Sequence, residues 1–353
     1  MSLAVAMRQM LSNGRLPSPK LLLLIPCLLM LYVLLPDRPR VSSKHRASSI
    51  SNYGLVDKML PTSRHAIATF LSGGEDSSVT AESFSSDAYF IATRTLVYQL
   101  LHAPDTRNNA SYASNIDVVV LVAPEVPAEN RQQLSREGAT VIEAQSVALP
   151  SWIKTSMTRW KDQFLKLRLL QETQYNRFLF IDADSVLTAP IDGIFAEDEA
   201  VEPAATMQRL SKADERLPDQ YVFAARSNNE FTGERDHPFP PKSTKLFSAG
   251  FWVAAPSQEL FSYLMSIMDH EGRFDPFTME QSLLNYAFRL DGPMPWRELH
   301  YKWSATWPNL KDLAGGVVSL HEKFWHTGPD ELRDLWTRRK DEMEKFWSEK
   351  KTT

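Results

Sequence analysis

Apolar and polar positions alternate in blocks along the first part of the chain, and the blocks fit strands and helices in turn. Buried strands are predicted for three apolar runs, residues 65–72, 115–124 and 139–144. Helices are predicted for two segments, residues 88–102 and 129–138. The polar segment 73–87 is predicted to be a loop. Strands that alternate with helices in this way predict an α/β fold with a mostly parallel sheet.

The second half of the chain has a less regular pattern. A helix over residues 162–176 leads into an apolar strand that ends at residue 181. Further strands are predicted at residues 246–257 and 315–325, and further helices at residues 258–272, 278–290 and from residue 329 onward. Residues 197–245 are polar and punctuated by proline, and we expect a long inserted loop with a binding role.

The N-terminal pattern is that of a membrane anchor. Residues 21–35 are uncharged and rich in leucine, which is short for a plasma-membrane span but fits a thinner bilayer. A cleaved signal peptide is the alternative, although residues 1–20 precede the run and no A-x-A site follows it. The sequence therefore predicts a cytoplasmic tail, a signal anchor, a stem, a folded domain and a charged C-terminal helix at residues 1–20, 21–36, 37–61, 62–335 and 336–353. The sequon Asn109-Ala110-Ser111 is consistent with a lumenal domain.

Charge and cysteine content narrow the chemistry. The 353 residues carry a formal net charge of −4, which argues against a nucleic-acid partner because no basic face is implied. The single cysteine, Cys27, lies in the apolar N-terminal run. The folded part therefore has no disulfide and no thiolate metal site, so a metal must be held by oxygen and imidazole ligands.

Two aspartates follow the apolar strand in RFLFIDADSVLTAPI (177–191). In open α/β sheets, ligands collect at the carboxyl ends of the strands, which is where Asp182 and Asp184 are expected. A D-x-D pair can share one Mg²⁺ or Mn²⁺ ion and leave its other positions open for phosphate oxygens.

Two other interpretations of the same letters remain open. DADSV also matches the D-x-D-x-[TV] pattern of haloacid-dehalogenase-like phosphatases, in which Asp182 is the phosphoryl-accepting nucleophile. That motif normally lies on the first strand of the fold, whereas several elements precede Asp182, and no later G-D-x-x-x-D cluster follows an apolar strand. The third interpretation is a capped turn without chemistry.

The surrounding residues carry a resemblance. KDQFLKLRLLQETQYNRFLFIDADSVLTAPIDGIF (161–195) closely resembles the glycosyltransferase family that includes glycogenin, with its K-L pair, T-Q-Y, D-x-D strand end and P-[ILV]-D-[DEG]-[IL]-F segment. The anchor, the stem and W-K-D-Q-F look most similar to fungal Golgi α-N-acetylglucosaminyltransferases. The resemblance covers about residues 62–335. It implies a GT-A-like, Rossmann-type nucleotide-sugar-binding fold with a mostly parallel central sheet, preceded by a single transmembrane helix.

The resemblance also implies site residues. It implies that Mn²⁺ is held by Asp182, Asp184 and His321, the last in a compressed HEKFW (321–325) that lacks the family's glycine and proline. It implies that the donor contacts Tyr89 in DAY (87–89), Lys166, Asp182, Ala183, Asp184, Ser248, Gly250 and Lys323. Glu280 and Gln281, in EQSLLN (280–285), are the candidates to flank the anomeric carbon.

Each of these positions also has a structural interpretation. Lys166 is interpreted alternatively as a surface-directed helix lysine, Tyr89 as a packing ring, Glu280 as an exposed helix-start carboxylate and His321 as a core histidine. Asp192 is predicted to be a helix N-cap because it precedes GIF. Trp303 and Trp307 fit either a sugar-stacking wall or ordinary packing.

We therefore expect a retaining, Mn²⁺-dependent glycosyltransferase in the Golgi membrane, single-pass type II, with a lumenal catalytic domain. It would transfer a sugar from a UDP-sugar to a glycan or glycoprotein acceptor, with N-acetylglucosamine favoured and glucose or galactose as alternatives. A phosphatase that uses DADSV and a non-catalytic nucleotide-sugar-binding membrane protein are the competing hypotheses.

Overall fold

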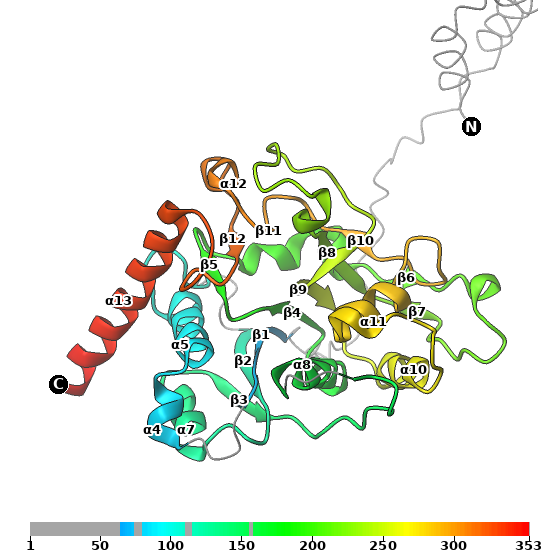
Figure 1. Cartoon of the computed structure of the whole chain (residues 1–353), viewed down its shortest axis with the longest axis horizontal. Coiled ribbons are helices and arrows are strands. Elements are labelled where there is room, and N and C mark those ends of the chain that lie inside the picture. Colours follow the sequence, from blue (N-terminus) through cyan, green and yellow to red (C-terminus); the bar gives the residue numbers. More distant parts are fainter. Residues whose placement is uncertain (1–63, 74–79, 110–114, 155–157, 353) are drawn as a thin grey trace, which may run out of the picture. The chain divides into compact units, whose positions relative to one another are not determined.

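The computed structural model describes residues 64–73, 80–109, 115–154 and 158–352 (Figure 1). The predicted tail, signal anchor and stem, residues 1–61, lie outside the described residues. Among the helices that are described, none is both long enough and apolar enough to cross a bilayer.

A seven-stranded sheet organises the described part of the chain. Its strands follow the order β10 (Arg297–Glu298), β8 (Phe223–Ser227), β9 (Phe247–Ala254), β4 (Arg177–Ile181), β1 (His65–Leu71), β2 (Ile116–Val122) and β3 (Thr140–Glu143). Six of these strands run in one direction, and β9 runs antiparallel to both of its neighbours, β4 and β8. The predicted α/β fold with a mostly parallel sheet is confirmed.

The central strands are apolar along their whole length because both faces of the sheet are covered. In β1 and β2, Ile67 pairs with Val118 and Phe70 with Leu121, and all four side chains are buried. Strands that are buried on both faces do not alternate between apolar and polar residues, which matches the continuous valine run of β2. The three strands predicted before residue 145 are thus present, with ends within a few residues of the prediction.

Helices flank the sheet. Figure 1 shows α4 (Ala81–Ser85), α5 (Ala88–Leu101) and α7 (Ala128–Arg136) together at the left, α8 (Thr158–Asp162) at the lower centre, and α10 (Gln258–Met268) and α11 (Glu280–Ala287) to its right. Two local predictions were wrong. The segment predicted as a loop contains α4, because Thr80 accepts a hydrogen bond from the Ser83 amide and caps it. The helix predicted over 162–176 is mainly a 3₁₀ helix, η1 (Gln163–Gln171).

The insertion 197–245 is more structured than predicted. It contains α9 (Asp198–Val201), β6 (Ala204–Ala205), η3 (Gln208–Leu210), β7 (Gln220–Tyr221), β8 and η4 (Asn229–Thr232). Strand β8 enters the central sheet, so the prediction of a loop was wrong there. The charged Arg226 interrupts the apolar pattern of β8, yet it is buried and bonded to Glu298 at 2.5 Å. The pairing with Glu298 offsets the cost of burying the charge of Arg226.

A second sheet is built around the D-x-D turn. It has the order β11 (Ser304–Thr306), β12 (Ser319–His321) and β5 (Ser185–Leu187). Strand β5 follows Asp184 directly, and its antiparallel pairing with β12 sets His321 opposite Ser185. Residues separated by well over a hundred positions in the chain therefore lie side by side at the end of β4.

The C-terminal helix α13 (Asp330–Thr352) packs along α5. Apolar side chains of α13 make this contact: Leu332, Trp336 and Met343 are buried, and Phe346 stacks on His102 with ring centroids 5.0 Å apart. The predicted domain boundary at residue 336 falls inside this helix.

Trp252 is the main aromatic anchor of the sheet, and its removal is expected to destabilise the fold. Its side chain is fully buried and stacks on Phe180 at 5.5 Å and on Phe223 at 5.4 Å. We expect Trp252→Ala to lower the free energy of unfolding by about 3–5 kcal/mol, measured by urea denaturation, because it leaves a large cavity. The control is Phe277→Ala, whose ring is 73% exposed and whose loss is expected to change stability little. Equal effects of the two variants would contradict this description of the core.

Candidate active site

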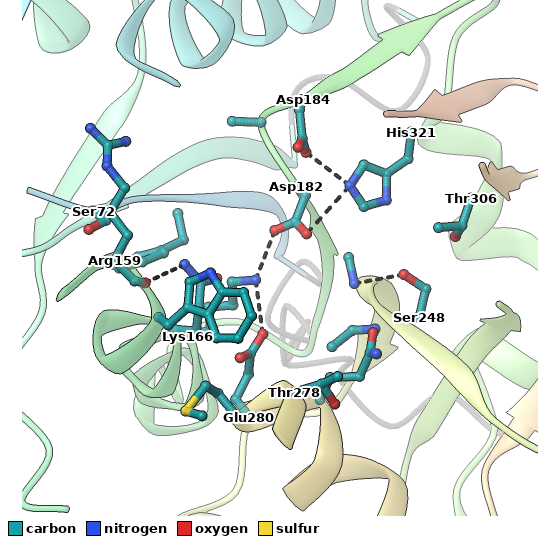
Figure 2. Close-up of a pocket in the computed structure, with 18 of the residues that line it drawn as sticks. Ser72, Arg159, Lys166, Asp182, Asp184, Ser248, Thr278, Glu280, Thr306 and His321 are labelled. Carbon is teal, nitrogen blue, oxygen red and sulfur yellow. Dashed lines mark hydrogen bonds and ion pairs between the residues drawn. The ribbon is translucent and has the colours of Figure 1, made fainter. Parts of the chain in front are cut away.

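A cavity of about 430 Å³ opens at the carboxyl end of β4 (Figure 2). All the residues predicted for the site line it: Tyr89, Lys166, Asp182, Ala183, Asp184, Ser248, Gly250, Glu280, Gln281, His321 and Lys323. They come from η1, the D-x-D turn, β9, α11, β12 with the turn that follows it, and the start of α5. The fold therefore brings the predicted set together in one place.

Asp182, Asp184 and His321 form a cluster of potential metal ligands. The His321 Nε2 atom lies 2.9 Å from Asp184 Oδ1 and 3.7 Å from Asp182 Oδ2. One ligand atom from each of the three side chains lies within 4.8 Å of the others. Two carboxylate oxygens and one imidazole nitrogen form a donor set that suits a divalent cation such as Mn²⁺.

Gly250 makes this cluster possible. Strands β4 and β9 pair antiparallel, and beyond the last pair, Ile181 with Phe251, the Asp182 amide donates a hydrogen bond to the Gly250 carbonyl at 2.9 Å. A Cβ atom at position 250 would lie 2.5 Å from His321 Cε1 and 2.7 Å from Asp182 Oδ2. Glycine is required here because two ligand side chains occupy the space that a methyl group would fill.

Lys166 lies beneath the cluster and links two carboxylates. Its Nζ atom donates to Asp182 Oδ1 at 2.9 Å and to Glu280 Oε1 at 3.1 Å (Figure 2). Burial lowers the pKa of Lys166, but the charges of Asp182 and Glu280 outweigh burial and hold the pKa above its usual value. Burial raises the pKa of Glu280, and Lys166 opposes that rise. The interpretation of Lys166 as a surface-directed lysine was therefore wrong.

His321 and Asp184 form a second charge pair. Burial lowers the pKa of His321, but the charge of the Asp184 carboxylate outweighs burial and raises the pKa to about 9. Burial raises the pKa of Asp184, and the charge of His321 outweighs it and lowers the pKa. The Asp184 carboxylate thus favours the protonated form of the imidazole, and a divalent cation would compete with that proton for the His321 nitrogen.

Tyr89 lies at one wall of the cavity and contacts Arg159, a residue that was not predicted from the sequence. Asp87 caps α5 by accepting from the Tyr89 amide at 2.9 Å, and it also accepts from Arg159 Nη2 at 2.5 Å. The Arg159 guanidinium lies 4.7 Å from the centre of the Tyr89 ring, and Lys323 Nζ lies 5.9 Å from it. Despite the compressed HEKFW segment, Lys323 does line the cavity. Arg159 has no recognised motif of its own and was missed.

The start of α11 forms the opposite wall. Gln281 Oε1 accepts from the Ala249 amide at 3.0 Å, which ties the helix to β9. Met279, just before Glu280, has φ 50° and ψ −122°, a backbone conformation that is strained for a residue with a side chain. This strained residue turns the chain so that Glu280, although it begins a helix, lies buried against Lys166.

Other residues of the cavity were not named individually from the sequence, and two of them lie in the insertion 197–245, for which a binding role was predicted. These other residues are Phe70, Ser72, Trp160, Gln163, Asn228, Glu230, Ala249, Thr278, Met279 and Thr306. The tryptophans proposed for a sugar wall do not line the cavity: Trp303 is buried in the core, and Trp307 lies beneath the Arg235 guanidinium at 5.0 Å. The predicted N-cap at Asp192 was also wrong, because Ile191 holds the cap position and the Asp192 carboxylate accepts from the Asn109 amide instead, at 2.9 Å.

Comparison with known proteins places this site in context. No family model matches the chain. An uncharacterised protein of Schizosaccharomyces pombe is 28% identical over 292 residues, which cover 73% of this chain and 74% of that protein. Galactinol synthase 3 of Arabidopsis thaliana is 25% identical over 250 residues, which cover 63% of this chain and 74% of the synthase. The similarity to galactinol synthase supports a glycosyltransferase.

Among solved structures, the glycosyltransferase GlyE of Streptococcus pneumoniae TIGR4 aligns with 82% of this chain and 64% of its own, at 13% identity and a TM-score of 0.47. The strand order gives an α/β fold with a mostly parallel central sheet. The phosphatase hypothesis is not favoured. The D-x-D motif follows β4 and not the first strand of the fold, and Asp182 contacts both Lys166 and His321.

Gly250→Ala is expected to disrupt the ligand cluster without unfolding the domain. The added methyl group would collide with His321 and Asp182, so these side chains must separate. We expect Mn²⁺ affinity, measured by isothermal titration calorimetry, to fall by roughly tenfold or more. In the control, Gly193→Ala, the new methyl group would meet only Trp303, at 3.2 Å. Unchanged Mn²⁺ affinity in Gly250→Ala would show that the cluster does not bind the ion.

Proposed function

We propose that the protein is a retaining glycosyltransferase that moves a sugar from a UDP-sugar to a hydroxyl group of a glycan or glycoprotein, with Mn²⁺ as its metal. The observation that carries this proposal is the cluster of Asp182, Asp184 and His321 beside the buried Lys166 in one cavity. Retention of the anomeric configuration rests on the resemblance to the glycogenin family.

The residues fit a divalent cation. Asp182 and Asp184 offer hard oxygen ligands, and His321 offers a nitrogen that Mn²⁺ accepts. When bound, the ion would neutralise the diphosphate leaving group as a Lewis acid. Asp182 faces two partners, with Oδ1 toward Lys166 and Oδ2 toward His321, so its carboxylate is fixed before any ion binds.

The cationic side chains of the cavity support a diphosphate. Lys166 stays charged because Asp182 and Glu280 raise its pKa, and Lys323 adds a second positive charge at the wall. We propose that both offset the charge that develops on the departing UDP. Catalysis then depends on positioning and on stabilisation of the leaving group.

Glu280 and Gln281 are proposed to orient the donor sugar. Glu280 accepts from Lys166, and Gln281 Oε1 accepts from the Ala249 amide. Both side chains are therefore fixed at the start of α11, where they line the cavity and would flank the anomeric carbon. Their fixed geometry favours orientation of the sugar over nucleophilic attack.

The donor sugar, the acceptor and the location are proposed from the sequence. N-acetylglucosamine is favoured by the resemblance to fungal enzymes, with glucose and galactose as alternatives. We propose a Golgi membrane location, single-pass type II, with the cavity in the lumen. The apolar run 21–35 supports the membrane location, and the sequon at Asn109 supports a lumenal domain.

Donor turnover by the full-length chain tests the proposal. The purified chain is incubated with Mn²⁺ and, separately, UDP-N-acetylglucosamine, UDP-glucose and UDP-galactose, and the release of UDP is measured. We expect turnover of at least one donor, and a loss of about 100-fold or more in Asp184→Asn and in His321→Ala, because each removes a ligand atom. Loss of turnover in EDTA and its recovery with Mn²⁺ is the matched control.

Two results of that experiment would contradict the proposal. Hydrolysis of p-nitrophenyl phosphate without donor turnover would favour the phosphatase hypothesis. Binding of UDP without turnover of any donor would favour a non-catalytic nucleotide-sugar-binding protein.

Lys166→Met is expected to lower kcat more than it raises the KM for the donor. The change removes the charge that faces Asp182 and Glu280 and is proposed to act on the leaving group. We expect a loss of about 10²–10³ in kcat, measured at saturating Mn²⁺. The exposed Lys161→Met, one turn away along the same segment, is the control and should match the wild type. A variant that changed only KM would show that Lys166 merely binds the donor.

A further inference from the structure

Arg235, in the insertion 197–245, contacts the segment that carries His321. Arg235 forms a two-pronged ion pair with Glu322: Nη1 lies 2.5 Å from Oε2 and Nη2 lies 2.8 Å from Oε1. The Glu322 side chain is only 10% exposed. A fork of two parallel bonds fixes the orientation of both partners as well as their distance.

Glu322 is the residue between two that line the cavity. His321 and Lys323 face the cavity, whereas the Glu322 carboxylate between them faces Arg235. The Glu322 amide donates to the Asp184 carbonyl at 3.2 Å. A contact that holds Glu322 in place therefore also holds the backbone of His321, its neighbour in the chain, and of Asp184, to which it is hydrogen-bonded.

Trp307 contacts both His321 and Arg235. Its amide donates to the His321 carbonyl at 3.2 Å, and its ring lies 5.0 Å from the Arg235 guanidinium. Trp307 has φ 55°, which is unfavourable for a bulky residue. The Arg235 guanidinium over its ring helps to keep this strained turn in place.

Arg235 is itself anchored to the body of the domain. Asn309 Nδ2 donates to the carbonyls of Arg235 and His237, at 3.1 Å in each case. His237 is fully buried, and its Nε2 lies 3.4 Å from Asp312 in α12 (Leu310–Ala314). The loop that carries Arg235 is therefore fixed at its backbone, and Arg235 acts from a rigid base.

We propose that Arg235 is a positioning residue for the metal site. Through Glu322 it fixes the β12 end, so that His321 and Lys323 face the cavity and Asp184 keeps its backbone position. The HEKFW segment has no proline of its own to stiffen it, and Arg235 supplies that constraint from a distant part of the chain. This inference rests on the proposed function, because it assumes that Asp182, Asp184 and His321 bind a divalent cation.

Mn²⁺ binding to the full-length chain tests the proposal without measuring turnover. Free Mn²⁺ is followed by electron paramagnetic resonance during titration of the wild type, Arg235→Ala, Glu322→Gln and the double variant. We expect the Kd to rise roughly tenfold or more in each single variant, as is typical when the support of a metal ligand is lost. The double variant should lose no more than one single variant, because both changes break the same contact.

Arg339→Ala is the matched control. Arg339 also binds a carboxylate with two nitrogens, Asp105 at 2.9 and 2.5 Å, but far from the cavity. We expect this change to lower the melting temperature in EDTA and leave the Mn²⁺ Kd unchanged. Arg235→Lys keeps the charge without the fork and covers the case in which Arg235→Ala does not fold; its Kd should lie between wild type and Glu322→Gln.

The outcomes separate the two levels of the proposal. Mn²⁺ affinities equal to the wild type in Arg235→Lys and Glu322→Gln would overturn the positioning role, as would a lower melting temperature with no change in Kd. Absence of Mn²⁺ binding by the wild type would overturn the proposed function together with this inference.

Discussion

The close approach of β9 to the end of β4 is the constraint on which the candidate site depends. Asp182 leaves the strand bonded through its amide to the Gly250 carbonyl, and Gly250 has no side chain to separate the two ligands above it. Because β9 runs antiparallel to β4, its first residues reach the end of β4 from which Asp182 and Asp184 emerge. The absence of a side chain at Gly250 thus allows the Asp182 carboxylate and the His321 imidazole to lie close enough to bind the same cation.

The charges of the site are balanced around Asp182. One of its oxygens faces Lys166 and the other faces His321, while Glu280 and Asp184 each pair with one of those two cations. The buried carboxylates of Asp184 and Glu280 and the partly buried carboxylate of Asp182 would repel one another strongly without the cations between them. The arrangement is therefore preorganised: the side chains already hold positions that suit a cation and a diphosphate. The Arg235–Glu322 ion pair is proposed to fix the backbone of this site in the same way.

Local patterns in the sequence predicted the parts of this fold that are continuous in the chain. The apolar runs of β1, β2 and β4 are long enough to stand out, and the D-x-D at the end of β4 marks the site. Strand β8 was not recognised because Arg226 interrupts it, and only the partner Glu298, far along the chain, explains a buried arginine there. A partner so distant leaves no local pattern.

The same limit applies to the residues of the site that were missed. Arg159, Asn228 and Glu230 reach the cavity through tertiary packing, and no spacing within their own segments indicates it. Lys166, Glu280 and His321 were identified through resemblance to a family, whereas their mutual contacts appear only in three dimensions.

The most direct test of the central claim is a crystal structure of the chain with Mn²⁺ and UDP, with anomalous data collected at the manganese absorption edge. We expect one anomalous peak in contact with Asp182, Asp184 and His321, with the diphosphate of UDP on the same ion and near Lys166. A peak elsewhere on the domain, or UDP bound in this cavity with no manganese between it and the aspartates, would contradict it.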